Sequence, residues 1–157
     1  MKNLKQQIQL VIDIFKSNDF AKAETMCKEL IEDNSKVVFL YNLLGLILSS
    51  QNKIDEALEY YEKGIQINPN FGMLYNNIGL LYFNHQTRKD LNKAEDYYQK
   101  SISIDKNIAE PHNNLGTLFN SQNKYEKAIK CYKQAIKINP NFYYAYYNLG
   151  TVNITLG

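Results

Sequence analysis

The sequence predicts an all-α fold, an α-solenoid in which short helical hairpins stack on one another. Two kinds of small residue recur at the same intervals of 34, 37 and 34 residues. They are Gly45, Gly79, Gly116 and Gly150, and Ala23, Ala57, Ala94 and Ala128. Pro69 and Pro140 lie 71 residues apart, which equals two of these intervals together. A fixed period of this length is typical of repeat proteins, whose units stack instead of enclosing one central core.

The composition is that of an ordinary folded protein. Of the 157 residues, 45% are hydrophobic and 22% are charged. The net charge of +2 gives no reason to expect a nucleic-acid partner, since lysine and glutamate are mixed along the chain. The start of the chain contains no long apolar run, so we expect neither a secretory signal nor a membrane partner, and we expect a cytoplasmic location.

The reactive residues are few and widely separated. Cys27 and Cys131 fall at core-type positions of the repeat, and we expect both to be buried thiols in a reducing compartment. A zinc site needs about four convergent ligands, and the two histidines add none at a useful spacing. No glycine-rich loop or paired nucleophile and base is present in the sequence. We therefore predict no catalytic residue, no metal and no cofactor.

One repeat, residues 37–70, shows how the unit is built. Its first half places Leu40, Leu44 and Leu48 at helical spacing, with Gly45 among them. A glycine inside a helix costs about 1 kcal/mol relative to alanine, so it indicates close approach of a neighbouring helix. Residues 50–53 are polar and form a turn.

The second half of that repeat predicts a second helix, which packs back on the first. Ile54, Ala57, Tyr61 and Ile65 stand at helical spacing. The helix ends before Pro69, because proline cannot continue the hydrogen-bond ladder and the residue before it leaves helical geometry. The unit is therefore a helical hairpin, in which Gly45 and Ala57 allow the two helices to pack tightly.

The remaining repeats follow the same pattern with individual departures. We divide a single domain, residues 1–157, into a degenerate repeat at 4–36, full repeats at 37–71, 72–108 and 109–142, and a half repeat at 143–157. In the first, Val11 replaces the glycine. The third carries three extra residues within 84–92, which lengthen a turn whose His85, Arg88, Lys89 and Asp90 either contact a partner or are simply solvated.

The pattern Tyr–x2–Leu/Ile–Gly–x2–Tyr/Leu/Phe, followed by Ala, Tyr and Pro on a 34-residue period, resembles the tetratricopeptide repeat. The resemblance covers essentially the whole chain. It implies a right-handed superhelix of antiparallel helix pairs, in which the first helices line a concave groove. The family serves many partners, so the resemblance is specific for the fold and not for the function.

In this family the groove-facing residues lie at fixed offsets from the glycine of the first helix, and those offsets fall on one helical face. The resemblance implies a wall of amides, hydroxyls and apolar groups with almost no charge. Tyr144 and Tyr147 either add an aromatic contact in the groove or pack at the edge of the core. The candidate peptide-binding residues are Asn42, Asn76, Asn77, Leu80, Phe83, Asn113, Asn114, Thr117, Asn120, Tyr144, Tyr147 and Asn148.

Three of these candidates stand two residues before their glycines and form a ladder, namely Asn77, Asn114 and Asn148. A carboxamide can both donate and accept, so it can pair with a peptide C=O and N–H. Alternatively, these asparagines are merely solvated in an asparagine-rich chain. A similar ladder is known in the repeat arm of O-GlcNAc transferases. Family members that bind chaperone tails instead use groove lysines and arginines. The corresponding positions of the full repeats hold neutral residues here, and in the degenerate repeat Ile8, Gln9 and Ile12 break the pattern around Lys5 and Lys16, so we expect no carboxylate clamp.

The expected function is that of a non-enzymatic protein–protein interaction scaffold, which binds a protein or extended peptide through the asparagine ladder. Two alternatives stay open: the substrate-recruiting arm of a larger enzyme such as an O-GlcNAc-transferase-like glycosyltransferase, and a structural assembly module. In the last half repeat we expect Leu149 and Val152 to lack a packing partner, and an end-to-end homodimer to form there. Tyr61, Tyr98 and Tyr132 follow their alanines by four residues and are expected in the core, and Tyr41, Tyr75 and Tyr146 are expected to pack between helices.

Overall fold

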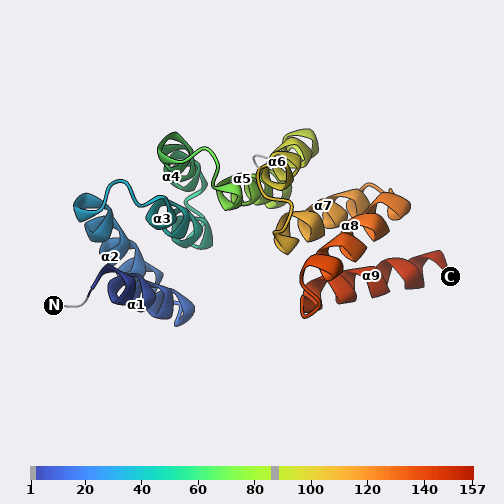
Figure 1. Cartoon of the computed structure of the whole chain (residues 1–157), viewed down its shortest axis with the longest axis horizontal. Coiled ribbons are helices and arrows are strands. Elements are labelled where there is room, and N and C mark those ends of the chain that lie inside the picture. The colour runs from blue at the N-terminus through green and yellow to red at the C-terminus, as the bar shows by residue number, and fades with distance from the viewer. Residues whose placement is uncertain (1–2, 86–88) are drawn as a thin grey trace. The chain divides into compact units, whose positions relative to one another are not determined.

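The computed structural model describes residues 3–85 and 89–157, and within those residues it contains nine α-helices and no strand (Figure 1). The all-α class predicted from the sequence is confirmed. Residues 86–88, and with them Arg88 of the lengthened turn, lie outside the described residues. The chain divides into two compact units, Met1–Leu74 and Tyr75–Gly157, which are described separately.

The first unit is a stack of two helical hairpins joined by short turns. The helices are α1 (Leu4–Lys16), α2 (Phe20–Asp33), α3 (Val38–Ser50) and α4 (Ile54–Ile67), and the unit ends in the first turn of α5 (Gly72–Asn84). Each helix packs on the next in the chain, α1 on α2, α2 on α3 and α3 on α4.

The second unit contains the rest of α5 and repeats the same arrangement. Its further helices are α6 (Leu91–Ile104), α7 (Ala109–Ser121), α8 (Tyr125–Ile138) and α9 (Tyr143–Leu156). α7 packs on α6 and α8, and α9 packs on both α8 and α7. The helix pairs coincide with the predicted repeats, while the prediction that all repeats form one domain stays a prediction.

Asparagines close the turns between the two helices of three hairpins. Asn18, Asn52 and Asn123 have φ values of 64°, 63° and 58°, in the left-handed region that asparagine tolerates better than most residues. The turn after Asn52 is held by a hydrogen bond of 2.9 Å from the Lys53 N–H to the Leu48 carbonyl. The polar turn residues of the sequence thus end each first helix and reverse the chain.

A tyrosine ring lies on each repeat glycine that is followed by a second helix. A Cβ atom at Gly79 would come within 2.8 Å of the Tyr98 ring, and one at Gly116 within 2.6 Å of the Tyr132 ring. Both tyrosines are fully buried. The predicted close approach is confirmed, and its physical form is ring against backbone, made possible because the glycine has no side chain.

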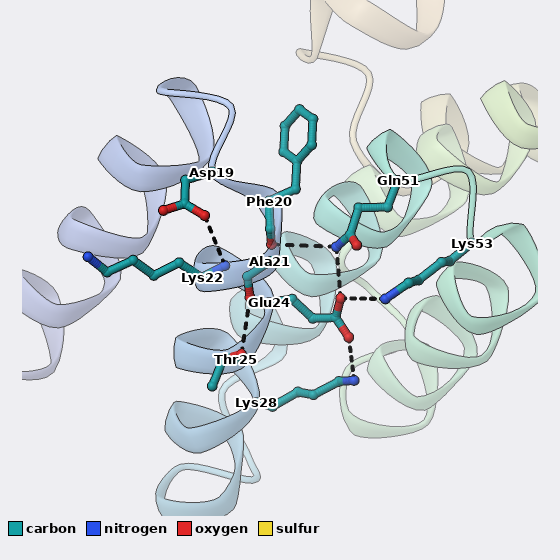
Figure 2. A network of polar contacts seen from close by, with 9 residues as sticks. All are labelled: Asp19, Phe20, Ala21, Lys22, Glu24, Thr25, Lys28, Gln51 and Lys53. Atoms are coloured by element: carbon teal, nitrogen blue, oxygen red, sulfur yellow. Dashed lines mark hydrogen bonds and ion pairs between the residues drawn. The ribbon is translucent and has the colours of Figure 1, made fainter.

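In the first unit, a polar network joins the two hairpins around Glu24 (Figure 2). The carboxylate accepts from Lys28 Nζ at 2.5 Å, from Lys53 Nζ at 2.7 Å and from Gln51 Nε2 at 2.8 Å. Gln51 and Lys53 come from the turn after α3, whereas Glu24 and Lys28 lie on α2. Burial by itself raises the pKa of Glu24, but the three hydrogen bonds outweigh it and lower the pKa to about 2.

The last helix, α9, differs from the expectation in which side chains it buries. Val152 is fully buried and Leu149 packs against the same cluster on α7 and α8, so the prediction that they lack a partner is wrong. Tyr146 is 49% exposed, in contrast to the buried Tyr41 and Tyr75, so its predicted packing between helices is also wrong. In this helix the residues that face α7 and α8 keep their partners, and the exposed ones lie on the other faces.

Candidate functional site

The predicted groove residues of the second unit lie on the first helices of the hairpins, α5, α7 and α9. Their burial divides them into three groups. Asn76, Asn77 and Asn113 are buried; Tyr144 and Tyr147 are exposed. The half-buried residues are Leu80, Phe83, Asn114, Thr117, Asn120 and Asn148. Asn42 belongs to the first unit, where it is buried on α3.

Five of the candidate asparagines form one continuous chain of hydrogen-bonded amides. Asn148 Nδ2 donates to Asn113 Oδ1 at 2.9 Å, and Asn113 Nδ2 donates to Asn114 Oδ1 at 3.4 Å. Asn114 Nδ2 donates to Asn76 Oδ1 at 2.9 Å, and Asn76 Nδ2 donates to Asn77 Oδ1 at 3.2 Å. The chain crosses from α9 through α7 to α5; the two bonds between helices, from Asn148 and from Asn114, each donate to the earlier helix, and the other two join adjacent residues of one helix.

The chain of hydrogen bonds explains how these asparagines can be buried without a large cost in free energy. A buried amide without a partner costs on the order of 1–3 kcal/mol, and here each amide is satisfied by its neighbour. An amide offers two N–H donors and two acceptor positions. The bonds between Asn114 and its neighbours use one donor and one acceptor. The remaining donor and acceptor of that half-buried side chain can bind a ligand without breaking the chain.

Thr117 connects the amide chain to helix α8 through hydrogen bonds. Its hydroxyl donates to the Asn113 carbonyl at 3.1 Å and accepts from Asn148 Nδ2 and from the Tyr132 hydroxyl, each at 3.4 Å. Asn148 and Thr117 therefore keep fixed positions relative to the second helix, α8. A ligand that docks on this wall meets groups that are already oriented.

The two exposed tyrosines extend the surface at the start of α9. Tyr144 and Tyr147 are 64% and 59% exposed, and both rings contact Tyr143, at centroid distances of 5.6 and 6.3 Å. They do not take part in the hydrogen bonds of the amide chain that are described above. Their aromatic faces are available for apolar or stacking contacts.

Two residues of this wall were not among the predicted site residues. Asn84 and Tyr98 line a small cavity together with Leu80, Phe83, Asn114 and Thr117. Tyr98 was expected only as a core residue. A comparison of two repeats could have identified Tyr98 from the sequence. The residue after the glycine is Thr117 in one repeat and Leu80 in the preceding one, so Tyr132 has a hydroxyl group nearby where Tyr98 has an apolar side chain.

Two features are absent from the part of the chain that is described. None of its helices has the length and apolar character needed to cross a bilayer. Within the same residues, no group of three histidine, cysteine, aspartate or glutamate side chains could hold a metal ion.

The fold defines a helical-repeat protein. Models of the tetratricopeptide repeat match residues 38–71 and, under the description TPR repeat, residues 116–157. A third model, described as the Est1 DNA/RNA binding domain, matches residues 57–127. The chain thus contains tetratricopeptide repeats, as its period predicts.

Solved structures agree with this fold. PilW, described as a widely conserved type IV pilus biogenesis factor, superimposes with a TM-score of 0.81 at 18% identity, over 98% of this chain and 71% of PilW. The first tetratricopeptide-repeat domain of Spaghetti (RPAP3), bound to the HSP90 peptide SRMEEVD, gives a TM-score of 0.66 at 23% identity, over 76% of this chain and 92% of that domain. At these identities the likeness establishes the α-solenoid fold and nothing further.

Among proteins related in sequence is the photosystem I assembly protein Ycf3 of Rippkaea orientalis (strain PCC 8801 / RF-1). It is 27% identical over 112 residues, which are 71% of this chain and 51% of Ycf3. The chain thus spans about half of the length of this relative.

Proposed function

We propose that this chain is a protein-interaction scaffold whose second unit binds an extended peptide on the amide-lined wall. The observation that carries the proposal is the chain of amides from Asn148 to Asn77, in which consecutive repeats contribute neighbouring side chains. A peptide backbone presents donors and acceptors at regular intervals, and the half-buried amide of Asn114, which retains a donor and an acceptor, is complementary to it.

The burial of the asparagines suggests a different role for each of them in peptide binding. Asn76, Asn77 and Asn113 are buried, so they support the row from behind. Asn114 and Asn148 are half-buried and offer the contact, with Asn120, Leu80 and Phe83 beside them. We therefore assign the backbone contacts to Asn114 and Asn148, and assign a positioning role to the buried amides. Asn42 contributes separately, from the first unit.

A selection of random 12-residue peptides on the immobilised chain, followed by calorimetric titration of the best binder, tests the proposal. Asn148→Ala is expected to weaken binding about two- to tenfold, the effect of one neutral hydrogen bond. Asn92→Ala is the matched control, since Asn92 is an exposed asparagine on α6 and lies outside the wall. Equal affinity of the Asn148 variant and the control, both fully folded by circular dichroism, would exclude the amide row as the site.

An assembly role is the second candidate, and the likeness to the assembly protein Ycf3 favours it. An assembly module would use its ends and second helices, so groove substitutions would leave complex formation intact. The third candidate, the recruiting arm of a larger glycosyltransferase, would require a catalytic domain outside this chain. In each case we propose that the chain itself is not an enzyme and works in the cytoplasm.

We propose a protein or peptide ligand in preference to a nucleic acid. Affinity for nucleic acid rests on lysine and arginine near phosphates, and the predicted groove residues include neither. The match to the Est1 DNA/RNA binding domain makes a direct measurement necessary. Fluorescence anisotropy with a 20-nucleotide single strand should show no binding tighter than about 100 μM at physiological salt. Tighter binding that weakens as salt rises would overturn this part of the proposal.

A further inference from the structure

A small cavity opens in the wall between α5 and α7, and the buried Tyr98 is one of the residues that line it. Its volume is about 130 Å³. The lining residues are Leu80, Phe83 and Asn84 from α5, Tyr98 from α6, and Asn114 and Thr117 from α7. For scale, an apolar cavity of about 150 Å³ accommodates a benzene molecule, so this one suits a single short side chain.

The Tyr98 hydroxyl is buried and has no hydrogen-bond partner among the atoms that the structure describes. Tyr98 itself is fully buried, and burial raises the pKa of its hydroxyl, so the group remains a neutral phenol at physiological pH. Buried hydroxyls without partners are rare in folded proteins, and each one needs a specific explanation.

A comparison with the next repeat explains why the Tyr98 hydroxyl has no partner. Tyr132 occupies the same position as Tyr98, one repeat later, and its hydroxyl reaches Thr117 Oγ1 at 3.4 Å. Thr117 is the residue directly after Gly116; the residue directly after Gly79 is Leu80. Leucine has no oxygen, so Leu80 cannot accept a hydrogen bond from the Tyr98 hydroxyl as Thr117 does from the Tyr132 hydroxyl.

We infer that this cavity is a subsite for one short, neutral, oxygen-bearing side chain of a bound peptide, with threonine as the best fit. The ligand hydroxyl accepts a hydrogen bond from Tyr98, as Thr117 does from Tyr132 within the chain. The ligand methyl group contacts Leu80 and Phe83. This inference rests on the proposed function, because it places a peptide on the same wall.

The lining residues also set what the subsite rejects. None of the six carries a charge, so a carboxylate or ammonium group would lose its hydration without gaining an ion pair. Asn114 retains a donor and an acceptor beyond its bonds to Asn76 and Asn113, which allows a second polar contact with the ligand. A valine side chain fits the shape but leaves Tyr98 without a partner.

The test uses two matched small probes, N-acetylthreonine N-methylamide and N-acetylvaline N-methylamide, titrated into the 15N-labelled chain by NMR. We expect the threonine probe to shift the amide signals of Leu80, Phe83 and Thr117 and to bind about two- to tenfold more tightly than the valine probe. Tyr98→Phe should abolish this preference, because only the hydroxyl distinguishes the probes. Leu80→Thr should weaken the threonine probe, since it supplies a partner for the Tyr98 hydroxyl from within the chain and removes the leucine side chain that contacts the ligand methyl group.

Thermal unfolding gives an independent reading of the same hydroxyl. Tyr98→Phe should leave Tm unchanged or raised, because it removes a polar group without a partner, whereas the matched Tyr132→Phe should lower Tm. An equal drop in both variants would overturn the inference, as would a threonine preference that survives Tyr98→Phe or no perturbation by either probe. Asn148→Ala separates the two proposals, since it should weaken the selected 12-residue peptide while the preference for the threonine probe over the valine probe, which depends on Tyr98, persists. If no peptide binds while the probes behave as expected, the proposed function fails and the subsite stands.

Discussion

The ring of Tyr132 lies directly on the backbone of Gly116, so that an added Cβ would sit 2.6 Å from the ring atom Cε1. Real Cβ atoms do not approach a ring so closely, and the tyrosine is fully buried and cannot move aside without disturbing its neighbours. The recurring glycine of this chain is thus a packing requirement of the hairpin.

Substituting Gly116 by alanine should therefore destabilise the fold. Overpacking of a filled core costs about 1–3 kcal/mol, partly offset by the roughly 1 kcal/mol that alanine gains in a helix. Gly150→Ala is the matched control, since nothing lies within 4 Å of its added Cβ, and it should be neutral or stabilising. Urea unfolding followed by circular dichroism measures both, and a Gly116 variant as stable as the Gly150 variant would contradict the packing argument.

The amide chain makes a second prediction about stability. Asn114→Ala removes the donor to Asn76 Oδ1 and the acceptor of Asn113 Nδ2, and both of those neighbours are buried. The loss should be about 1–3 kcal/mol in the free energy of unfolding. The exposed Asn92→Ala should stay within about 0.5 kcal/mol of the wild type. Similar stability of the two variants would mean that solvent replaces the amide bonds at no cost.

How much of this could be predicted from the sequence differs between fold and site. The interval between glycines predicts the helix pairs and the burial of Tyr61, Tyr98 and Tyr132, because a period is set by backbone geometry that every repeat shares. It does not predict that Asn76 and Asn113 are buried supports, since hydrogen bonds between neighbouring repeats depend on side-chain positions. Nor could it predict that Val152 is buried. The last helix keeps this contact because the preceding hairpin, α7 and α8, is enough to cover Val152.

The network around Glu24 predicts a specific loss of stability in acid. Because hydrogen bonds from Lys28, Lys53 and Gln51 lower the folded-state pKa to about 2 from 4.5, stability is fully present above pH 4.5 and is lost as the pH falls toward 2. The two lysine side chains are 40% and 38% exposed, so solvent screening limits the contribution to roughly 1–2 kcal/mol.

Glu24→Gln should therefore be less stable than the wild type at pH 7, and the difference should shrink to near zero by pH 2. Glu59→Gln, which removes the exposed pair with Lys63, serves as the control and should change stability by less than about 0.5 kcal/mol at any pH. Urea unfolding at pH 7, 4 and 2 gives the comparison. A Glu24 difference that does not depend on pH would show that the charge is not its source.

The HSP90 peptide SRMEEVD, which is bound in the RPAP3 structure, should not bind this chain. It carries several carboxylates, and the groove positions here hold asparagine, leucine, threonine and tyrosine. We expect an affinity weaker than about 1 mM by calorimetry. The RPAP3 domain is the positive control for the peptide. Micromolar binding of this peptide would contradict the prediction that the chain has no carboxylate clamp.

The exposed face of α9 carries the last prediction, the association of two copies. Tyr143, Tyr147 and Ile154 are 67%, 59% and 83% exposed, and their spacing places them on one side of the helix. If this face joins two copies, light scattering should show a mass that rises with concentration, and Tyr143→Ser with Ile154→Ser should hold the chain monomeric. Phe39→Ser, at an apolar residue 38% exposed on α3, should leave association unchanged. A monomer at every concentration, or equal effects of both changes, would remove α9 as the interface.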